Sequence, residues 1–350
     1  MDNLALIQKN VFIVLGMGRS GTSAITRSLL ALGIDLGDRL LPGNQHNEKG
    51  FWEDADILYK INRGVHHALN DNWLTVGRLT DTEINQHPTL RHYQQDAIRL
   101  LQQRLAATQH WGFKDPHTVK ILPFWQAVFK TLTVDEHYII TIRNPLAIAH
   151  SHQKFFDTEL EIGMMSWLVC TYAAIEGTHG KKRVVVAYEQ MLQDPVVELQ
   201  RIHQSLGIAQ PLNDTAINEY AKTFLDRSLN HHDYTDEAFK THRLAAVVPL
   251  CVQLHALMMR LAKDEIDFNS IEFQSAWQEI KQAFTVIFPA YDYTYTLLRQ
   301  NRNLKRTIRA IHRSIFYRIT YPLRIIENML RNYRRQRRIA KYRFIPDKFA

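Results

Sequence analysis

Hydrophobic residues in the first part of the chain occur in two patterns, short continuous runs and longer stretches with helical spacing. The short runs, each typical of a buried strand, are residues 11–15, 138–142 and 184–187, and residues 112–114, which follow Trp111, are a further candidate strand. Between them, apolar residues recur every three or four positions, most clearly in residues 23–32, 89–107 and 196–206. Strands that alternate with helices pair in parallel through right-handed crossovers. The pattern therefore predicts an α/β fold with a doubly wound, mainly parallel sheet flanked by helices.

The second half of the chain is dominated by helical patterns. Residues 211–295 show no strand pattern and are predicted to be helical, with loops around residues 230–236. Residues 296–350 are mostly compatible with helix, with a break expected at Pro322. We expect the arginines of this segment to leave no wide apolar face. The prediction is an α/β domain over residues 1–295 followed by a basic, mostly helical tail over residues 296–350.

Composition is that of a folded, enzyme-sized protein, because 45% of its 350 residues are apolar. The two cysteines, Cys170 and Cys251, lie far apart and have no metal-ligand spacing. We therefore expect reduced thiols and a cytoplasmic location. No apolar stretch approaches the roughly 20 residues of a spanning helix, and a core strand is predicted from Val11, which leaves no room for a signal peptide.

Charge is distributed unevenly along the chain. The net charge is +8, but residues 296–350 contain 16 Lys and Arg against two acids, Glu327 and Asp347. This imbalance predicts an acidic partner for the tail. In residues 314–324 arginines alternate with Ile, Phe and Tyr, which suits the anionic inner face of a membrane. Nucleic acid is the less favoured acidic partner, and a solvated tail without a partner is the other alternative.

The segment Gly16-Met17-Gly18-Arg19-Ser20-Gly21-Thr22-Ser23 follows the first predicted strand and leads into a helix. Glycines allow a tight turn that aims backbone N–H groups and the positive end of the helix dipole at a phosphate. The spacing matches the phosphate-binding loop of P-loop NTPases, except that Thr22 replaces the lysine. We therefore predict a P-loop NTPase-like anion site, with Arg19 supplying positive charge.

A second segment, residues 139–145, is an apolar strand that delivers Arg143 to its carboxyl end. Open α/β sheets bind ligands at this edge. Ser151 would lie about two turns along the helix that follows Pro145. A guanidinium and a hydroxyl that converge on one phosphate suit a nucleotide 3′-phosphate, which ATP lacks.

Together the two segments resemble those of sulfotransferases that use 3′-phosphoadenosine-5′-phosphosulfate (PAPS), in particular the bacterial type. The resemblance implies that residues 18–23 bind the 5′-phosphosulfate and that Arg143 and Ser151 bind the 3′-phosphate. Residues 184–195 are similar to the strand and turn that often follow, so the likeness covers about residues 11–235. No metal is expected, because a sulfuryl group carries less charge than a terminal phosphoryl group.

The chain also departs from the family pattern. Arg19 stands where many relatives have lysine, and the later glycine-rich loop that contacts the 3′-phosphate is not recognisable. Arg227, in residues 224–229, is taken as a candidate for that contact.

Transfer to a hydroxyl requires a base that removes the acceptor proton. In related bacterial and Golgi-type sulfotransferases a glutamate from the segment after the first helix has this role, so Glu53 is the predicted base. The alternative is that Glu53 or Asp54 caps a helix that begins near Ala55. His46 and Asp115 are further candidates.

Lys114 ends another predicted strand. It is predicted to stabilise charge on the leaving phosphate or to hold the acceptor, the alternative being a solvated lysine.

The leading hypothesis is transfer of a sulfuryl group from PAPS to a hydroxyl, or with less support an amine, of an acceptor. Residues 314–324 resemble a short tail motif of bacterial enzymes of surface-polysaccharide assembly, and this resemblance, with the habit of the sulfotransferase family, implies a saccharide-containing acceptor in cell-surface polysaccharide synthesis. A P-loop kinase or NTPase is one alternative, although it would need a lysine at position 22. A non-catalytic nucleotide-binding scaffold, tethered to a membrane by its tail, is the other.

Overall fold

Four parallel strands form the sheet in a computed structural model that describes residues 8–44, 47–69, 87–226 and 234–342. The strand order is β2-β1-β3-β4, with bounds β1 Asn10–Leu15, β2 His110–Lys114, β3 Asp135–Ile142 and β4 Lys182–Ala187. Each strand contains the run predicted for it and begins one to three residues earlier. The predicted parallel α/β fold is confirmed.

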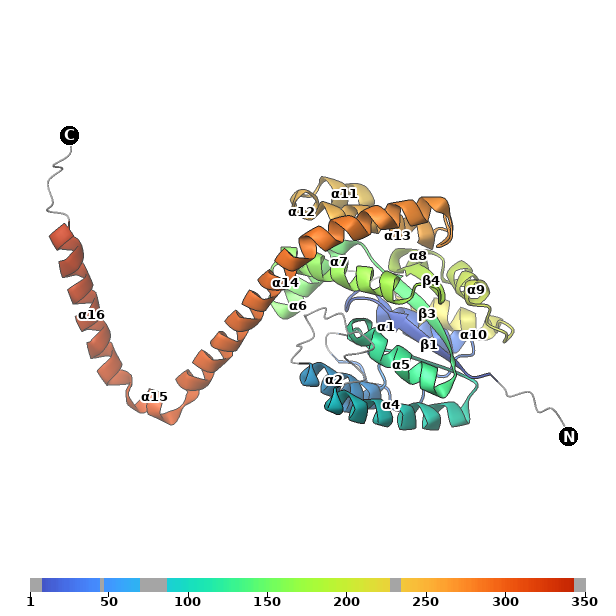
Figure 1. The fold of residues 1–350 in the computed structure, drawn as a ribbon, viewed down its shortest axis with the longest axis horizontal. Helices are drawn as coiled ribbons and strands as arrows, with labels where there is room; N and C mark the ends of the chain where they lie inside the picture. Colours follow the sequence, from blue (N-terminus) through green and yellow to red (C-terminus); the bar gives the residue numbers. More distant parts are fainter. Residues whose placement is uncertain (1–7, 45–46, 70–86, 227–233, 343–350) are drawn as a thin grey trace. The chain divides into compact units, whose positions relative to one another are not determined.

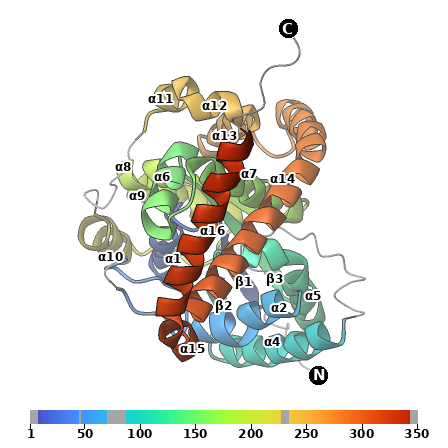
Figure 2. The same cartoon turned by 90° about the vertical axis from the view of Figure 1, so that its left-hand side faces the viewer.

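Helices cover both faces of the sheet (Figures 1 and 2). One face of β1, which carries Phe12 and Val14, packs in a core with α1 (Thr22–Ala31) and α9 (Pro195–Leu206). The opposite face of the sheet packs on α7 (Leu160–Gly177) and, through Phe113, on Trp125 of α5 (Leu122–Leu132). Alternate strand residues therefore serve two cores, as a doubly wound sheet requires.

The other elements are mostly short helices. In chain order they are η1 Ile57–Asn62, α2 Arg63–Ala68, α4 Pro88–Ala107, η2 Thr118–Ile121, α6 Pro145–Phe156, α8 Tyr188–Gln193, α10 Asp214–Glu219, η3 Tyr220–Phe224, α11 Asp236–Thr241, α12 Arg243–Val247 and α13 Pro249–Ala262. The helices predicted at residues 23–32, 89–107 and 196–206 correspond to α1, α4 and α9. No strand appears among the described residues of 211–295, as predicted.

Parallel pairing places the carboxyl ends of all four strands at one edge of the sheet. The glycine-rich loop follows β1, Lys114 ends β2, Arg143 follows β3 and Tyr188 follows β4. Residues from four distant parts of the sequence are thereby collected where open α/β sheets bind ligands.

The chain separates into two compact units, residues 1–292 and 293–350. The long helix α14 (Ile271–Arg313) begins in the first unit, where Phe273, Trp277 and Phe284 are buried. It is followed by α15 (Ile315–Ile319) and α16 (Tyr321–Tyr342). In the part of the chain that the structure describes, no helix is both long and apolar enough to cross a membrane.

Two expectations about the tail are wrong. Its helical breaks fall at Ser314 and Thr320, and Pro322 is the second residue of α16 rather than the site of the break. A proline is well placed there because the first turn of a helix does not need its N–H. The arginines also leave a continuous apolar stripe exposed on α16, at intervals of three or four residues: Leu323, Ile326, Leu330 and Tyr333.

Three buried histidines are expected to make the fold sensitive to acid. Burial lowers the pKa of His137, His152 and His255 to about 4, whereas an unfolded histidine titrates near 6.5. The unfolded chain therefore binds more protons than the native state as the pH falls below about 6.5, and stability is lost until about pH 4. Each histidine would cost on the order of 2 to 3 kcal/mol at pH 4.

Urea denaturation across this pH range measures the effect. We expect the denaturation midpoint to fall steeply with acidification, and the slope to become shallower in His255→Phe, which cannot titrate. A midpoint that does not change between about pH 6.5 and 4 would contradict this prediction.

Candidate functional site

The loop between β1 and α1, where an anion site is predicted, makes a tight turn. Gly21 adopts a left-handed conformation, φ 86°, and a Cβ atom there would lie 2.1 Å from the ring of Tyr188. Only glycine fits this close approach. The hydroxyl of Ser20 donates to the carbonyl of Met17 at 2.7 Å and closes the loop on itself.

Helix α1 begins directly after this loop. Its first turn contains no acidic residue, so the positive end of its dipole is not neutralised from within the helix. Thr22 is the first helical residue and is buried. The loop and helix start can therefore receive an anionic group, and residues 18–23 remain the predicted ligands of the 5′-phosphosulfate.

Arg143 reaches the same loop from the end of β3. Its Nη1 donates to the carbonyl oxygen of Arg19 at 3.1 Å, and its guanidinium lies 5.1 Å from the ring centre of Tyr188. The next residue, Asn144, starts α6 by accepting a hydrogen bond from the N–H of Leu146 at 3.0 Å. A strand end and a capped helix start thus fix Arg143 beside the phosphate loop.

Arg19 connects the loop to the second predicted phosphate site. Its Nε donates to Oγ of Ser151 at 3.0 Å, and its guanidinium lies over the ring of Phe155 at 4.2 Å. Nε2 of His152 donates to the carbonyl of Gly18 at 3.2 Å, which ties α6 to the loop a second time. Burial, together with the nearby Arg143, lowers the pKa of Arg19. The residues predicted for the 5′ and 3′ groups therefore form one cationic cluster.

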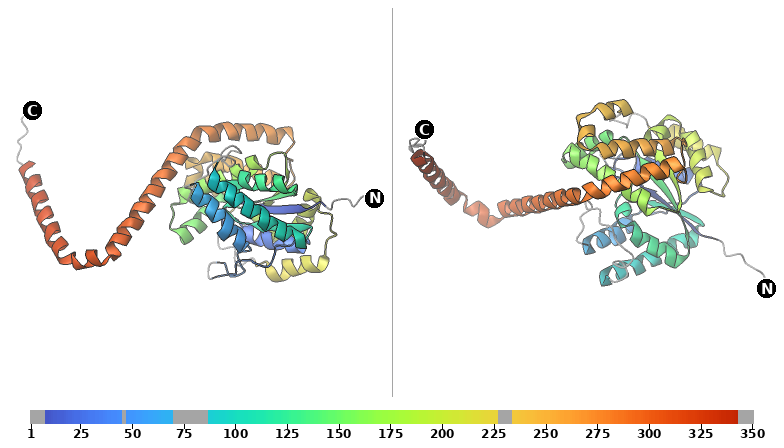
Figure 3. Two further views of the ribbon diagram at one scale, coloured as in Figure 1. Left: turned by 60° about the horizontal axis from the view of Figure 1, so that its bottom comes forward. Right: turned by 45° about the horizontal axis from the view of Figure 1, so that its top comes forward.

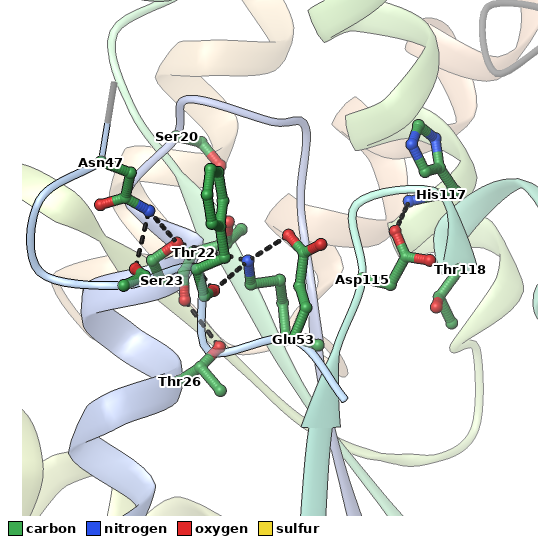
Figure 4. Close-up of polar contacts among 12 residues, drawn as sticks. Ser20, Thr22, Ser23, Thr26, Asn47, Glu53, Asp115, His117 and Thr118 are labelled. Carbon is green, nitrogen blue, oxygen red and sulfur yellow. Dashed lines mark hydrogen bonds and ion pairs between the residues drawn. The ribbon is translucent and has the colours of Figure 1, made fainter. Parts of the chain in front are cut away.

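Lys114 and Glu53 form a buried ion pair at the start of α1. The Lys114 Nζ donates to Oε1 of Glu53 and to the carbonyl of Phe51, both at 2.7 Å, and to Oγ of Ser23 at 3.3 Å. The Lys114 side chain is 1% exposed and that of Glu53 is 11% exposed, so the alternative of a solvated lysine is wrong. Figure 4 shows Glu53 between Ser23 and Asp115.

The environment of Glu53 is that of a weak acid. Burial raises the pKa of Glu53, Lys114 lowers it, and the nearby Asp115 raises it again. A carboxylate with a raised pKa accepts a proton more readily than a solvated one.

Helix capping in this region is done by Asp54, not by Glu53. Oδ1 of Asp54 accepts from the N–H groups of Asp56 at 2.8 Å and Ile57 at 3.1 Å, and Arg104 forms an ion pair with Oδ2 at 2.9 Å. Glu53 is therefore not needed as a cap and stays available as the predicted base.

The other candidates for the base are less accessible or lie outside the described residues. Asp115 is 1% exposed, and its carboxylate accepts from Nδ2 of Asn62 at 2.7 Å and from the N–H of His117 at 2.9 Å. His46, and Arg227 as a 3′-phosphate ligand, fall outside the described residues.

An aromatic cleft between residues 40–52 and residues 219–224 was not predicted. It has a volume of about 560 Å³ and is lined by Trp52 and Phe224, whose rings meet edge to face at 5.8 Å. The guanidinium of Arg27 lies 5.3 Å from the Trp52 ring and pairs with Glu219 at 2.8 Å. No sequence pattern indicates that the segments carrying Trp52 and Phe224 lie together. The adjacent aromatic residues Phe51 and Trp52 after Gly50 were the one sequence feature that could have pointed to an aromatic site.

Comparison with known proteins gives the family. The model of the sulfotransferase family matches residues 11–214. No curated protein sequence matches the chain. Among the described residues, no group of three or more His, Cys, Asp or Glu side chains could hold a metal ion.

The solved structures that match share little sequence with the chain. The sulfotransferase domain of the Synechococcus PCC 7002 olefin synthase has 18% identity and a TM-score of 0.38, over 74% of this chain and 96% of that domain. The sulfotransferase domain of the curacin biosynthetic pathway has 15% identity and a TM-score of 0.36, over 79% and 98%. Retinol dehydratase in complex with retinol and PAP has 13% identity and a TM-score of 0.33, over 81% and 83%.

The family model covers more than half of the chain and spans both phosphate-binding segments as well as Glu53 and Lys114. The protein therefore belongs to the sulfotransferase family, as these two segments predicted.

Proposed function

We propose that the protein transfers the sulfuryl group of PAPS to a hydroxyl of a saccharide-containing acceptor during cell-surface polysaccharide synthesis. An amine acceptor is the less favoured alternative. Membership of the sulfotransferase family assigns the chain to sulfuryl transfer rather than to the kinase or NTPase class.

The joined cationic cluster is the observation that carries the assignment of the donor site. Arg19 bonds to Ser151 and Arg143 bonds to the backbone of Arg19, so the loop and α6 form one surface for two anionic groups. Residues 18–23 would hold the 5′-phosphosulfate, and Arg143 with Ser151 would hold the 3′-phosphate. Two separate phosphate-like groups on one nucleotide are what PAPS offers and ATP does not.

The buried ion pair of Glu53 and Lys114 supports the assignment of the catalytic residues. Glu53 would take the proton of the acceptor hydroxyl as the new S–O bond forms. Lys114 and Arg19 would stabilise negative charge on the leaving phosphate, and the N–H groups of the loop would orient the donor. The base, the cations and the N–H donors of this mechanism are all groups of the protein chain.

The basic tail supports a place at the inner face of a membrane. Its 16 basic residues against two acids favour an anionic lipid surface, where a saccharide acceptor under assembly would be presented. Nucleic acid is not favoured as the partner, because the apolar stripe of α16 would stay exposed on it.

Calorimetric titration with adenosine 3′,5′-bisphosphate tests the donor assignment. We expect Arg143→Ala to weaken this ligand by about 10- to 100-fold, the cost of losing a charge-assisted hydrogen bond to phosphate. Adenosine 5′-phosphate, which lacks the 3′ group, should bind both proteins alike. The exposed Arg243, changed to Ala, is the matched control.

Two outcomes would overturn the donor assignment. One is a bisphosphate affinity that does not change in Arg143→Ala. The other is tighter binding of ATP with Mg²⁺ than of the bisphosphate.

The aromatic cleft is the proposed site for the adenine base. Stacking of a base on an aromatic side chain is worth about 1–3 kcal/mol by alanine substitution, so Trp52→Ala should raise the Kd for adenosine 3′,5′-bisphosphate by about 5- to 100-fold. Inorganic pyrophosphate, used as a competitor of the bisphosphate, should inhibit mutant and wild type equally. A Trp52→Ala protein with unchanged affinity would place the base elsewhere.

A further inference from the structure

The bend between the two long helices of the tail is an ordered element. Figures 1 and 3 show α15 as the short segment between the end of α14 and α16. Oγ of Ser314 accepts from the N–H of Tyr317 at 3.2 Å, and the Arg324 guanidinium lies 3.2 Å from the Tyr317 ring centre. Arg324 also donates to Oγ1 of Thr320 at 2.8 Å, and His312 stacks on Tyr317 at 4.4 Å. Polar and aromatic contacts therefore hold residues 314–324 in a defined turn.

Large apolar side chains project from this turn into solvent. Five residues within nine positions are between 60 and 83% exposed: Ile315, Phe316, Ile319, Tyr321 and Leu323. Single exposed apolar residues are ordinary, but a dense group of them marks an interaction site. The contacts that fix the turn are made by other residues, so these five side chains are not needed to build it.

The directions of these side chains indicate the kind of partner. Consecutive residues of a helix point about 100° apart, so Ile315 and Phe316 project to different sides of α15. A fluid apolar phase can surround both. The charges beside the turn indicate the same phase: Lys305, Arg306, Arg309 and Arg313 are exposed before it, and Arg331 and Arg334 after it.

We propose that residues 314–324 are an insertion tip that enters the boundary between headgroups and acyl chains of an anionic bilayer. The exposed cations before and after the tip would contact lipid phosphates, while the five apolar side chains leave water. This inference rests on the proposed membrane location of residues 296–350 and gives the charged residues and the tip separate roles in binding. Charge attracts the tail to the surface, and the tip inserts.

A probe at Phe316 tests insertion directly. Cys170 and Cys251 are both buried, so Phe316→Cys in the full chain offers an accessible thiol for the environment-sensitive fluorophore NBD. We expect its emission to shift to the blue on phosphatidylglycerol vesicles and to be quenched by brominated acyl chains. The control, NBD at Val247→Cys, replaces an exposed residue of the first unit and should not respond.

Three results would overturn the proposal. The first is a water-like NBD spectrum at Phe316 on vesicles that carry the protein down in sedimentation, since charge alone would then explain binding. The second is a blue shift that depends on protein concentration without vesicles, which would assign the tip to a second copy of the chain. The third is a blue shift produced by polyuridylic acid but not by lipid, which would assign it to nucleic acid.

A double variant separates insertion from attraction. Phe316→Ser with Ile319→Ser should weaken vesicle binding by about 10-fold or more in high salt, where surface charge is screened, and less in low salt. Equal binding of variant and wild type in high salt would contradict insertion. Affinity for adenosine 3′,5′-bisphosphate, measured on the same protein, should not change. If the wild-type protein did not bind adenosine 3′,5′-bisphosphate, the donor assignment would be wrong, and the proposal for the tip would be unaffected.

Discussion

Replacing Glu53 with glutamine is expected to lower kcat for sulfuryl transfer by about 10²- to 10⁴-fold, the usual contribution of a general base. Glutamine keeps the shape of the side chain and can still accept a hydrogen bond from Lys114, but it cannot take a proton. The affinity of the Glu53→Gln protein for adenosine 3′,5′-bisphosphate should equal that of the wild type. Transfer of ³⁵S from labelled PAPS to a panel of saccharides first identifies an acceptor, and kcat is then measured at saturating donor.

The pH profile distinguishes a base from a residue that only supports the fold. Burial raises the pKa of Glu53, and the carboxylate works only when deprotonated, so wild-type kcat should fall on the acidic side as Glu53 protonates. Glu53→Gln should lack this acidic limb. Glu272→Gln, which changes an exposed carboxylate at the start of α14, is the control. A Glu53→Gln protein with wild-type kcat would remove Glu53 from the mechanism and turn attention to Asp115.

The parts of the fold that were predictable depend on local sequence. Buried parallel strands need apolar runs, so β1, β3 and β4 were visible in the sequence, whereas β2, which contains Gly112 and Lys114, was a candidate on weaker grounds. The phosphate loop was equally visible, since a glycine at Gly21 and a helix start after it are encoded within eight residues. Pro145 located the start of α6 in the same way.

The parts that were missed depend on tertiary contacts. Lys114 at a strand end could have been solvated, and only the segment carrying Phe51 and Glu53 shows why it is buried. The cleft between Trp52 and Phe224 joins segments that no sequence period connects. The contact of Arg19 with Ser151 spans 132 positions and follows from strand order, which the sequence left open.

The tail shows why composition alone misleads about a helical face. Its many arginines suggested that no wide apolar face would remain, yet helical spacing keeps Leu323, Ile326 and Leu330 in line while Arg324 and Arg331 point away from them. The position of each residue around the helix, not the number of charges, decides whether a stripe survives.

Replacing Lys114 with methionine is expected to move the acidic limb of the kcat profile to higher pH. Lys114 lowers the pKa of Glu53, against burial and Asp115, which raise it. Without the ammonium group the pKa of Glu53 rises further, so a higher pH is needed to produce the carboxylate that acts as base. A residue that merely packed against the loop would lower kcat without moving the limb.

Stability should change with the same pH dependence. Breaking a buried ion pair by removing one partner costs about 3–5 kcal/mol when the remaining charge stays buried. In Lys114→Met this cost should be present at high pH, where Glu53 is ionised, and should decrease as the pH falls through the raised pKa of Glu53, because the protonated acid needs no counter-charge. The double variant Lys114→Met with Glu53→Gln should recover most of the stability and none of the activity. Urea denaturation of the single and double variants at two pH values measures this coupling. The contrary result is a loss of stability that does not depend on pH and is not recovered in the double variant. It would show that Lys114 stabilises the fold through contacts other than Glu53.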